Sequence, residues 1–451
     1  MKIRGIKSGM VMQCGKDNYC DIFFTASEPV TSVECNCYCK RRKPEVHEEA
    51  NGYRLQGIEA GGPYTLKIND TVFCDIYVGD VWLLAGQSNM QGIGKRINIS
   101  NNNNPCIRAY SVNDNWGVAN HPLHRLGTAV HPVHKGLGAA PARFDIRGVG
   151  PGLSFAEKMY ELTAVPQGII ACAHGGTNLK YQWAPSLKST DPQNSLYDAM
   201  YQRYVDNGSN VKGVFWYQGC SDTHEDRYLE YSDNMINFVE CMRHDFQSEL
   251  PFVQVQIARN SWESADKPQT AVMWSSIREQ QRLLNDKIDN FDTVSAIAHE
   301  LEDCIHLTAS SQEIVGADAA ESMFCLINGK QHGCRPGIKL RSAELVPYEY
   351  DEDRYCVLIL IYDNVHGELT GGSRAVGFDT SYSKEHADHC GINRVVCDGN
   401  TVTLCSPFSA DDLKKRYLWY GYGVNPPCNI VDKKGRPIPA FGPILISDLL
   451  K

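Results

Sequence analysis

Ser88 follows an apolar run closely, at a position where a serine can act as a nucleophile. The run Val81–Ala85 is typical of a buried strand, and Gly86 comes directly after it. In open parallel sheets, ligands bind beyond the carboxyl ends of the strands, and a glycine there lets the backbone turn sharply so that a hydroxyl faces outward. The spacing makes Ser88 a candidate nucleophile, although a serine in such a loop, taken alone, is more typical of a helix cap.

A carboxylate and a histidine occur together further along the chain. Asp303 precedes His306 by three residues, just before a helical pattern. An aspartate at this spacing can accept a hydrogen bond from Nδ1, fix the imidazole tautomer and stabilise the imidazolium that forms when Nε2 takes a serine proton. The pair is predicted to be the general base that Ser88 needs, whereas a lone histidine at such a junction is more typical of a cap or a surface residue.

Acyl transfer also needs hydrogen-bond donors for the oxyanion, and two further segments offer them. Gly175 and Gly176 follow a second apolar run, and paired glycines free a backbone N–H to point into a site. Gln218 follows a third apolar run, and its side-chain amide can donate. A glycine pair alone is an ordinary turn, and a glutamine at a strand end is an ordinary loop residue. Four coherent segments at four predicted strand ends favour a single active site.

The four segments together resemble the SGNH hydrolases, in particular the branch of sialate O-acetylesterases and acetylxylan esterases. GQSNM around Ser88, HGGT with the later Trp183, WYQGCSD and DCIHLT are similar to that branch's blocks and occur in the same order. AGGPYT near the start and NPPCN near the end are similar to its flanking β regions, so the resemblance covers nearly the whole chain.

The resemblance implies an α/β fold with a flavodoxin-like parallel-sheet core and a two-step acyl transfer that needs no metal or organic cofactor. The segment 98–145 is expected to help form a wall that faces the sugar. The residues implied are a catalytic Ser88, Asp303 and His306, an oxyanion hole of Ser88 N–H, Gly175 or Gly176 N–H and the Gln218 amide, and substrate contacts by Gln87, Asn89 and Trp183.

One departure from the family's blocks concerns Cys220, which stands where the family often has glutamate. A thiol cannot accept the strong hydrogen bonds that a carboxylate accepts, so the support of the oxyanion loop is expected to differ. Another is Gln218, because the broader superfamily uses asparagine there. Cys220 as the nucleophile is the disfavoured alternative, because no nearby feature indicates a depressed thiol pKa.

Four histidines in two HPxH runs could suggest a metal site. They are His121, His124, His131 and His134. Proline beside each pair and the lack of a cysteine or carboxylate partner make metal binding a weak interpretation. A histidine-bearing loop beside the active site is the favoured one, and no metal is predicted.

Composition excludes several other classes of function. The formal net charge is -9 and the lysines and arginines are dispersed, which argues against a nucleic-acid partner. The N-terminal residues lack an apolar run of signal-peptide length, and no stretch approaches ~18 apolar residues. We therefore expect no membrane association and a cytoplasmic location, with the 18 cysteines as reduced, mostly buried thiols.

Hydrophobic periodicity predicts three regions, namely a β domain at 1–78, a catalytic α/β domain at 79–335 and a second β domain at 336–451. The long stretch 98–150 resists assignment. The strands expected in the catalytic region are Val81–Ala85, Gly168–Ala173, Val211–Tyr217, Phe252–Ala258 and Thr293–Ala298, with helices at 153–163, near 196–204, and near 226–246, 270–286 and 309–327. An Asp398-Gly399 pair predicts a hairpin turn in the last region, and Glu349 to Arg354 predicts a solvated turn.

Taken together, the sequence predicts a carbohydrate O-acetylesterase, with a sialate O-acetylesterase-like activity favoured. Its expected partner is an O-acetylated mono- or oligosaccharide. One alternative is an acetylesterase of plant-derived xylo- or manno-oligosaccharides. A non-enzymatic alternative is a carbohydrate-binding protein with an inert core, and activity on p-nitrophenyl acetate separates it from the esterases.

Overall fold

The computed structural model describes the chain except for residues 37–42, 98, 100, 138–145, 186–194, 263–266, 348–355, 389 and 451. The expected turn from Glu349 to Arg354 therefore lies outside the described residues. The chain divides into two compact units. Unit 1 comprises Met1–Thr177, Tyr181–Trp216 and Asn237–Phe252, and unit 2 comprises Asn178–Lys180, Tyr217–Ile236 and Val253–Lys451.

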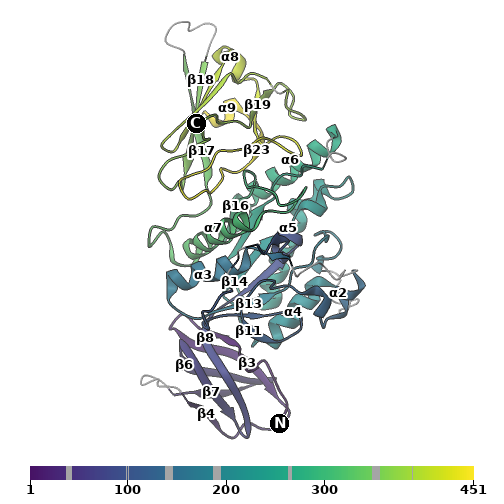
Figure 1. Cartoon of the computed structure of the whole chain (residues 1–451), viewed down its shortest axis with the longest axis vertical. Coiled ribbons are helices and arrows are strands. Elements are labelled where there is room, and N and C mark those ends of the chain that lie inside the picture. The colour runs from purple at the N-terminus through teal and green to yellow at the C-terminus, as the bar shows by residue number, and fades with distance from the viewer. Residues whose placement is uncertain are drawn as a thin grey trace. The chain divides into compact units, whose positions relative to one another are not determined.

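Unit 1 begins with antiparallel β structure. One sheet has the order β1-β3-β6-β5, while β2 and β7 pair with the N-terminal part of the long strand β8 and β4 pairs with β7 (Figure 1). Side chains along β3 alternate between buried and partly exposed, which is the pattern of a strand with one face on a core. The strands are β1 (Ile3–Arg4), β2 (Val11–Gln13), β3 (Tyr19–Ala26), β4 (Val33–Asn36), β5 (Glu45–Glu49), β6 (Gly52–Glu59), β7 (Gly61–Ile68) and β8 (Thr71–Gly86).

Strand β8 carries the chain from this β structure into the α/β part of unit 1. It continues without a break past residue 78, and every residue from Ile76 to Gly86 is buried. Its parallel neighbour is β13 (Gln167–Ala171), and β10 (Ile107–Tyr110) pairs in parallel with β13 on the far side. Strands with both faces covered read as continuous apolar runs, which explains why the sequence predicts β8 and β13 well.

Strand β10 lies in the stretch that the sequence left unassigned. It has only four residues, all buried, and one of them is Arg108. The order of strands in unit 1 is β11-β10-β13-β8-β14. The remaining elements of this part are α1 (Ser88–Gln91), β9 (Gly94–Lys95), β11 (Trp116–Val118), α2 (Pro132–Gly136), β12 (Arg147–Val149), α3 (Gly152–Thr163), α4 (Leu196–Asp206) and β14 (Gly213–Tyr217).

Unit 2 contains the last strands and helices of the α/β region. The long helix α7 packs against β16 (Figure 1) and is buried along most of its length. The predicted helices near 270–286 and 309–327 are confirmed. The elements are β15 (Phe252–Gln256), α6 (Pro268–Leu283), β16 (Phe291–Ser295) and α7 (Ala309–Asn328), and α5 (Tyr231–Phe246) has residues in both units.

The end of unit 2 is β structure, as the sequence predicts. One antiparallel sheet has the order β17-β18-β21-β20, and a second has the order β19-β22-β23. The predicted hairpin turn is confirmed, because β20 pairs antiparallel with β21 and Gly399 has a φ of 55°. The elements are β17 (Lys339–Pro347), β18 (Cys356–Asp363), β19 (Phe378–Ser381), β20 (Arg394–Asp398), β21 (Thr401–Ser406), α8 (Ala410–Leu413), β22 (Tyr417–Tyr420), β23 (Phe441–Leu445) and α9 (Ile446–Leu449).

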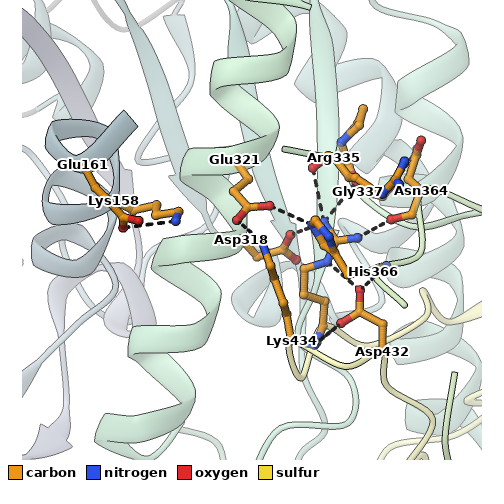
Figure 2. A network of polar contacts seen from close by, with 12 residues as sticks. Lys158, Glu161, Asp318, Glu321, Arg335, Gly337, Asn364, His366, Asp432 and Lys434 are labelled. Carbon is orange, nitrogen blue, oxygen red and sulfur yellow. Dashed lines mark hydrogen bonds and ion pairs between the residues drawn. The ribbon is translucent and has the colours of Figure 1, made fainter. Parts of the chain in front are cut away.

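A buried network of charges joins α7 to the C-terminal β structure within unit 2. Asp318 and Glu321 project from α7 toward Asp432 and Lys434 (Figure 2). Arg436 lies 3.0 Å from Asp318 and 2.9 Å from Asp432, and all three side chains are at most 5% exposed. Charges removed from water are tolerated only when they are paired, so these contacts hold α7 against the C-terminal segment.

The described parts of the chain contain no helix that is long and apolar enough to cross a membrane. Every cysteine that the structure describes is a free thiol.

Candidate active site

Ser88 is the partly exposed residue in an otherwise buried turn of unit 1. The preceding Gly86 has a φ of 135°, so the predicted sharp turn after the strand is confirmed. Gln87 and Asn89, which the sequence places at the substrate, are 4% and 2% exposed. The turn therefore presents the serine and keeps both neighbouring side chains inside the protein.

Gly175 lies directly against Ser88. A methyl group placed on Gly175 would come within 3.3 Å of the Ser88 Cβ and 2.9 Å of the Gln91 Oε1. The Gly175 N–H donates a 2.8 Å hydrogen bond to that same Gln91 oxygen. Gly176 has a φ of 73°, is exposed and has open space around its Cα. One of the two predicted backbone donors is thus engaged by a glutamine that the sequence analysis missed.

Trp183 belongs to the interior of unit 1. Its side chain is fully buried, and its indole Nε1 donates a 2.9 Å hydrogen bond to Oγ1 of Thr177. Its ring packs edge-on against Trp216 at 5.1 Å between centroids. The sugar-facing wall expected of Trp183 is therefore not formed by its ring in this structure, because the apolar contacts hold the indole inside and fix the end of the HGGT turn.

The two HPxH runs do not gather into a metal site. Among the described residues, no three histidine, cysteine or carboxylate side chains are grouped so that they could hold a metal ion. His134 instead stacks on His174, with the two Nδ1 atoms 2.9 Å apart. Burial lowers the pKa of His134 to about 2 and that of His174 to about 4, so both rings are neutral at physiological pH.

Asp303 and His306 form a hydrogen-bonded pair in unit 2. Both carboxylate oxygens of Asp303 lie close to Nδ1 of His306, at 3.0 and 2.9 Å. An ionised carboxylate only accepts hydrogen bonds, so Nδ1 carries a proton, and the neutral imidazole is held in the tautomer whose Nε2 has a lone pair. The side chains are 28% and 20% exposed, which leaves the imidazole accessible.

The same carboxylate also accepts backbone hydrogen bonds. The N–H groups of Ile305 and His306 each donate to Oδ1 of Asp303 at 3.0 Å. Partial burial alone would raise the pKa of Asp303, but the hydrogen bonds from His306 and from these backbone groups hold it well below its ordinary value. Asp303 therefore stays ionised throughout the neutral and mildly acidic range.

Helix α7 begins directly after this pair, as the sequence predicts. Thr308 is its N-cap residue, and its Oγ1 accepts a 3.2 Å hydrogen bond from the Ser311 N–H. The backbone N–H of Glu302 donates to the His306 carbonyl, which closes the loop that carries both side chains. The capped helix and the closed loop give the pair a rigid base.

Gln218 is buried at the end of β14 and is oriented by Asp222. Its Nε2 donates a short hydrogen bond to Oδ2 of Asp222, and Gln281 donates to its backbone carbonyl at 2.9 Å. Asp222 also accepts from the Leu179 N–H at 3.1 Å. Because a carboxylate accepts only, it directs the NH₂ end of the Gln218 amide, and not its oxygen, toward itself.

Asp222 is a second residue that the sequence analysis missed as functional, although it ends the WYQGCSD block. Burial raises the pKa of its carboxyl to about 6, against the opposing hydrogen bond from Gln218. In the sequence, the one feature that indicates a role for Asp222 is its position four residues after Gln218, which is close enough for the two side chains to contact each other.

Cys220 is excluded as a nucleophile by its surroundings. Burial raises the pKa of its thiol to about 12, so it is protonated at neutral pH. The neighbouring Gly219 has a φ of 141°, and a methyl group there would meet Nε2 of Gln281 at 2.9 Å. Gln281 therefore packs closely against this loop, and it also donates to the Gln218 carbonyl at 2.9 Å.

The predicted site residues are shared between the two units. Unit 1 holds Gln87, Ser88, Asn89, Gly175, Gly176 and Trp183, and unit 2 holds Gln218, Asp303 and His306.

The α/β fold and the motif segments at its strand ends define a carbohydrate esterase of the SGNH type. The chain belongs to the family described as carbohydrate esterase, sialic acid-specific acetylesterase, whose model matches residues 78–325. The predicted fold class and family are therefore confirmed. The chain is an enzyme that hydrolyses carboxylic esters, which removes the alternative of an inert carbohydrate-binding protein.

Known proteins similar to this chain agree with the family. A probable carbohydrate esterase of Arabidopsis thaliana is 31% identical over 271 residues, covering 54% of this chain and 91% of the plant protein. Human sialate O-acetylesterase is 29% identical over 303 residues, and the match spans 56% of that longer protein. The crystal structure of a carbohydrate acetylesterase from Xanthomonas citri has the same fold, with a TM-score of 0.69 at 21% identity over 97% of this chain and 98% of the other.

Proposed function

We propose that this enzyme removes acetyl groups from O-acetylated sugars, with a sialate O-acetylesterase-like activity as the first choice. The observation that carries the mechanism is the hydrogen-bonded pair of Asp303 and the partly exposed His306, which holds the neutral imidazole in the tautomer whose Nε2 can take a proton. The half-buried hydroxyl of Ser88, on a turn with Gly175 packed against it, is the matching nucleophile.

In the first step, Oγ of Ser88 attacks the acetyl carbonyl carbon while Nε2 of His306 takes the hydroxyl proton. The tetrahedral intermediate then collapses, the bond to the sugar oxygen breaks, and the imidazolium returns the proton to that oxygen. In the second step water attacks the acetyl-serine by the same route and releases acetate. Asp303 stays ionised and stabilises the imidazolium each time.

The oxyanion needs donors at the position it will occupy. The backbone N–H of Ser88, that of Gly176 and the second amide hydrogen of Gln218 are the proposed donors. Gly175 can serve only if Gln91 releases its N–H, because one hydrogen serves one strong acceptor at a time.

Whether the enzyme prefers an acidic or a neutral sugar depends on whether an arginine near the active site can bind the carboxylate of the sugar. Recognition of a sialic carboxylate favours a bidentate guanidinium. The arginines nearest to the site segments in the sequence are Arg143, Arg147 and Arg259. Arg259 donates a 2.9 Å hydrogen bond to Oδ1 of Asn425, and Arg143 lies outside the described residues. The engagement of Arg259 favours, as a second candidate, the neutral acetylated xylo- and manno-oligosaccharides.

The test is acetate release measured side by side from 9-O-acetylsialic acid and from acetylated xylo- and manno-oligosaccharides. Preferred cleavage of the sialate substrate supports the first choice. Cleavage of the neutral oligosaccharides alone rejects it in favour of the second candidate. Inactivity on all three, together with inactivity on p-nitrophenyl acetate, would refute the proposed acetylesterase function.

A further inference from the structure

A polar hollow of about 540 Å³ lies in the C-terminal β structure of unit 2. One wall is the loop 369–377, and the other is the edge strand β20 with the residues before it. Pockets of roughly 300–1,000 Å³ hold small organic ligands, so this volume is sufficient for one or two sugar residues. None of the catalytic candidates lines it.

The hollow carries positive charge without a compensating acid. Arg374 of the loop and Arg394 of β20 both line it and are exposed, and none of its lining residues is acidic. Within the described part of the chain, no carboxylate pairs with either guanidinium. The acid that precedes the loop, Glu368, is instead paired with Lys433 at 3.2 Å. In a chain of net charge -9, two uncompensated arginines in one hollow favour an anionic ligand.

The loop that carries Arg374 is fixed before any ligand arrives. The Asn429 side chain accepts from the Val376 N–H at 3.0 Å and donates to the carbonyls of Gly371 and Arg374 at 2.9 and 2.7 Å. Thr370 exchanges two backbone hydrogen bonds with Val431 on its other side. A wall that is already ordered loses little conformational entropy when it binds, which favours a binding role.

We propose that this hollow is a second carbohydrate site, which binds a carboxylate-bearing sugar residue through Arg374 and Arg394. The guanidinium groups pair with the carboxylate, and the polar side chains of Ser373 and Asn393 line the hollow where they can meet hydroxyl groups. Thr370 can donate its hydroxyl hydrogen, while its oxygen accepts from the Gly372 N–H at 3.1 Å. The choice of a sugar as the ligand rests on the proposed function, whereas the anion site itself does not. The C-terminal β structure would then serve to retain acidic glycans on the enzyme.

The test is calorimetric titration of the full chain with ligands that lack an ester and so cannot be hydrolysed. These are N-acetylneuraminic acid, glucuronic acid, the neutral primary amides of both, and inorganic phosphate. We expect both acids to bind and their amides to bind weakly. Arg374→Gln and Arg394→Gln should each weaken binding by at least about tenfold, the usual effect of losing a charge-assisted hydrogen bond. Arg341→Gln, which removes an exposed arginine paired with Asp363, is the matched control and should change nothing.

The two acids distinguish two kinds of acidic sugar. Binding of N-acetylneuraminic acid alone identifies a sialic acid as the ligand, and binding of glucuronic acid alone identifies a uronic acid. Equal binding of the neutral amides or equally tight binding of phosphate would overturn the proposal, as would binding unchanged in both variants. Hydrolysis of p-nitrophenyl acetate should remain at the wild-type rate in Arg374→Gln and Arg394→Gln. Binding of the acids that is lost in the variants while esterase activity stays at the wild-type rate therefore supports this site independently of the proposed function. Absent esterase activity in the wild-type chain counts against the proposed function and does not test this site.

Discussion

The backbone N–H of Gly175 donates a 2.8 Å hydrogen bond to Oε1 of Gln91, three residues beyond Ser88. The two residues are 84 positions apart and come from turns after neighbouring parallel strands. The bond ties the turn of the proposed nucleophile to the turn of the proposed oxyanion donors. It makes the spacing between these two turns a feature that small substitutions can disturb.

We predict that Gly175→Ala lowers kcat by about tenfold or more, because the added methyl group displaces the Gln91 amide and crowds Ser88. Gly176→Ala is the comparison variant, because alanine keeps the backbone N–H that is proposed as an oxyanion donor. Its methyl group meets open space, and a φ of 73° costs about 1–2 kcal/mol of stability without touching Ser88. Steady-state kinetics and urea unfolding of both variants check this. A larger kcat loss in Gly176→Ala than in Gly175→Ala would contradict it.

Ser88→Ala should abolish turnover of p-nitrophenyl acetate and of acetylated sugars, because it removes the attacking oxygen. The fold should persist, as judged by circular dichroism and an unchanged melting temperature. Ser248→Ala, at an exposed serine, is the control and should keep full activity. More than trace activity in Ser88→Ala would assign the nucleophile elsewhere.

Asp303→Asn should lower kcat by about 10⁴ with little change in KM, because asparagine can hold His306 in the wrong tautomer. Asp411→Asn, at a side chain that is 86% exposed, serves as the control. Since the pKa of Asp303 is held well below its ordinary value, its protonation should not produce the acidic limb of the pH profile. An unchanged kcat would disprove the pairing with His306.

Gln218→Ala should cost on the order of 10²–10³ in kcat, as the loss of an oxyanion donor does. Asp222→Asn should lower kcat about tenfold at pH 8, since an asparagine can present a donor to Gln218 and reverse its amide. The double variant should be little worse than Gln218→Ala alone, because Asp222 acts through Gln218. A loss confined to KM would move Gln218 to substrate binding.

The Asp222 variant also predicts a pH dependence. Burial raises the pKa of Asp222 to about 6, so wild-type Asp222 accepts hydrogen bonds fully above this pH and carries a proton below it. The ratio of wild-type to Asp222→Asn kcat should therefore be large at pH 8 and approach one below pH 6. Taking the ratio cancels any pH dependence that the two enzymes share. A ratio independent of pH would contradict the role of the ionised carboxylate.

Arg436→Met should destabilise the chain by about 3–5 kcal/mol, because it leaves Asp318 and Asp432 buried without a cation. Arg341→Met removes the ion pair with Asp363, in which the Arg341 side chain is 53% exposed. It should lower the free energy of unfolding by less than about 1 kcal/mol. Free energies of unfolding in urea provide the comparison. Equal effects of the two substitutions would show that the network in Figure 2 contributes no more than a surface pair.

The sequence by itself determined the features that depend on near neighbours. Asp303 and His306 contact each other because they are three residues apart on one turn, and the Asp398-Gly399 turn joins adjacent strands. Apolar runs identified β8 and β13, since a strand covered on both faces must be apolar along its length. The family's motifs determined the class of enzyme, because each motif is a short run of neighbouring residues that can be recognised without the fold.

Only the tertiary structure decided the features that join distant segments. The four residues of β10 are too short for a periodic pattern and become a strand only through pairing with β13, 60 residues later. The burial of Trp183, the engagement of Gly175 by Gln91 and the pairing of Asp318 with Arg436 likewise depend on where distant segments meet. Hydrogen bonds and packing act over a few ångströms, so a contact between residues about 80 to 120 positions apart leaves no periodic trace in the chain and exists only once the sheet has brought its segments together.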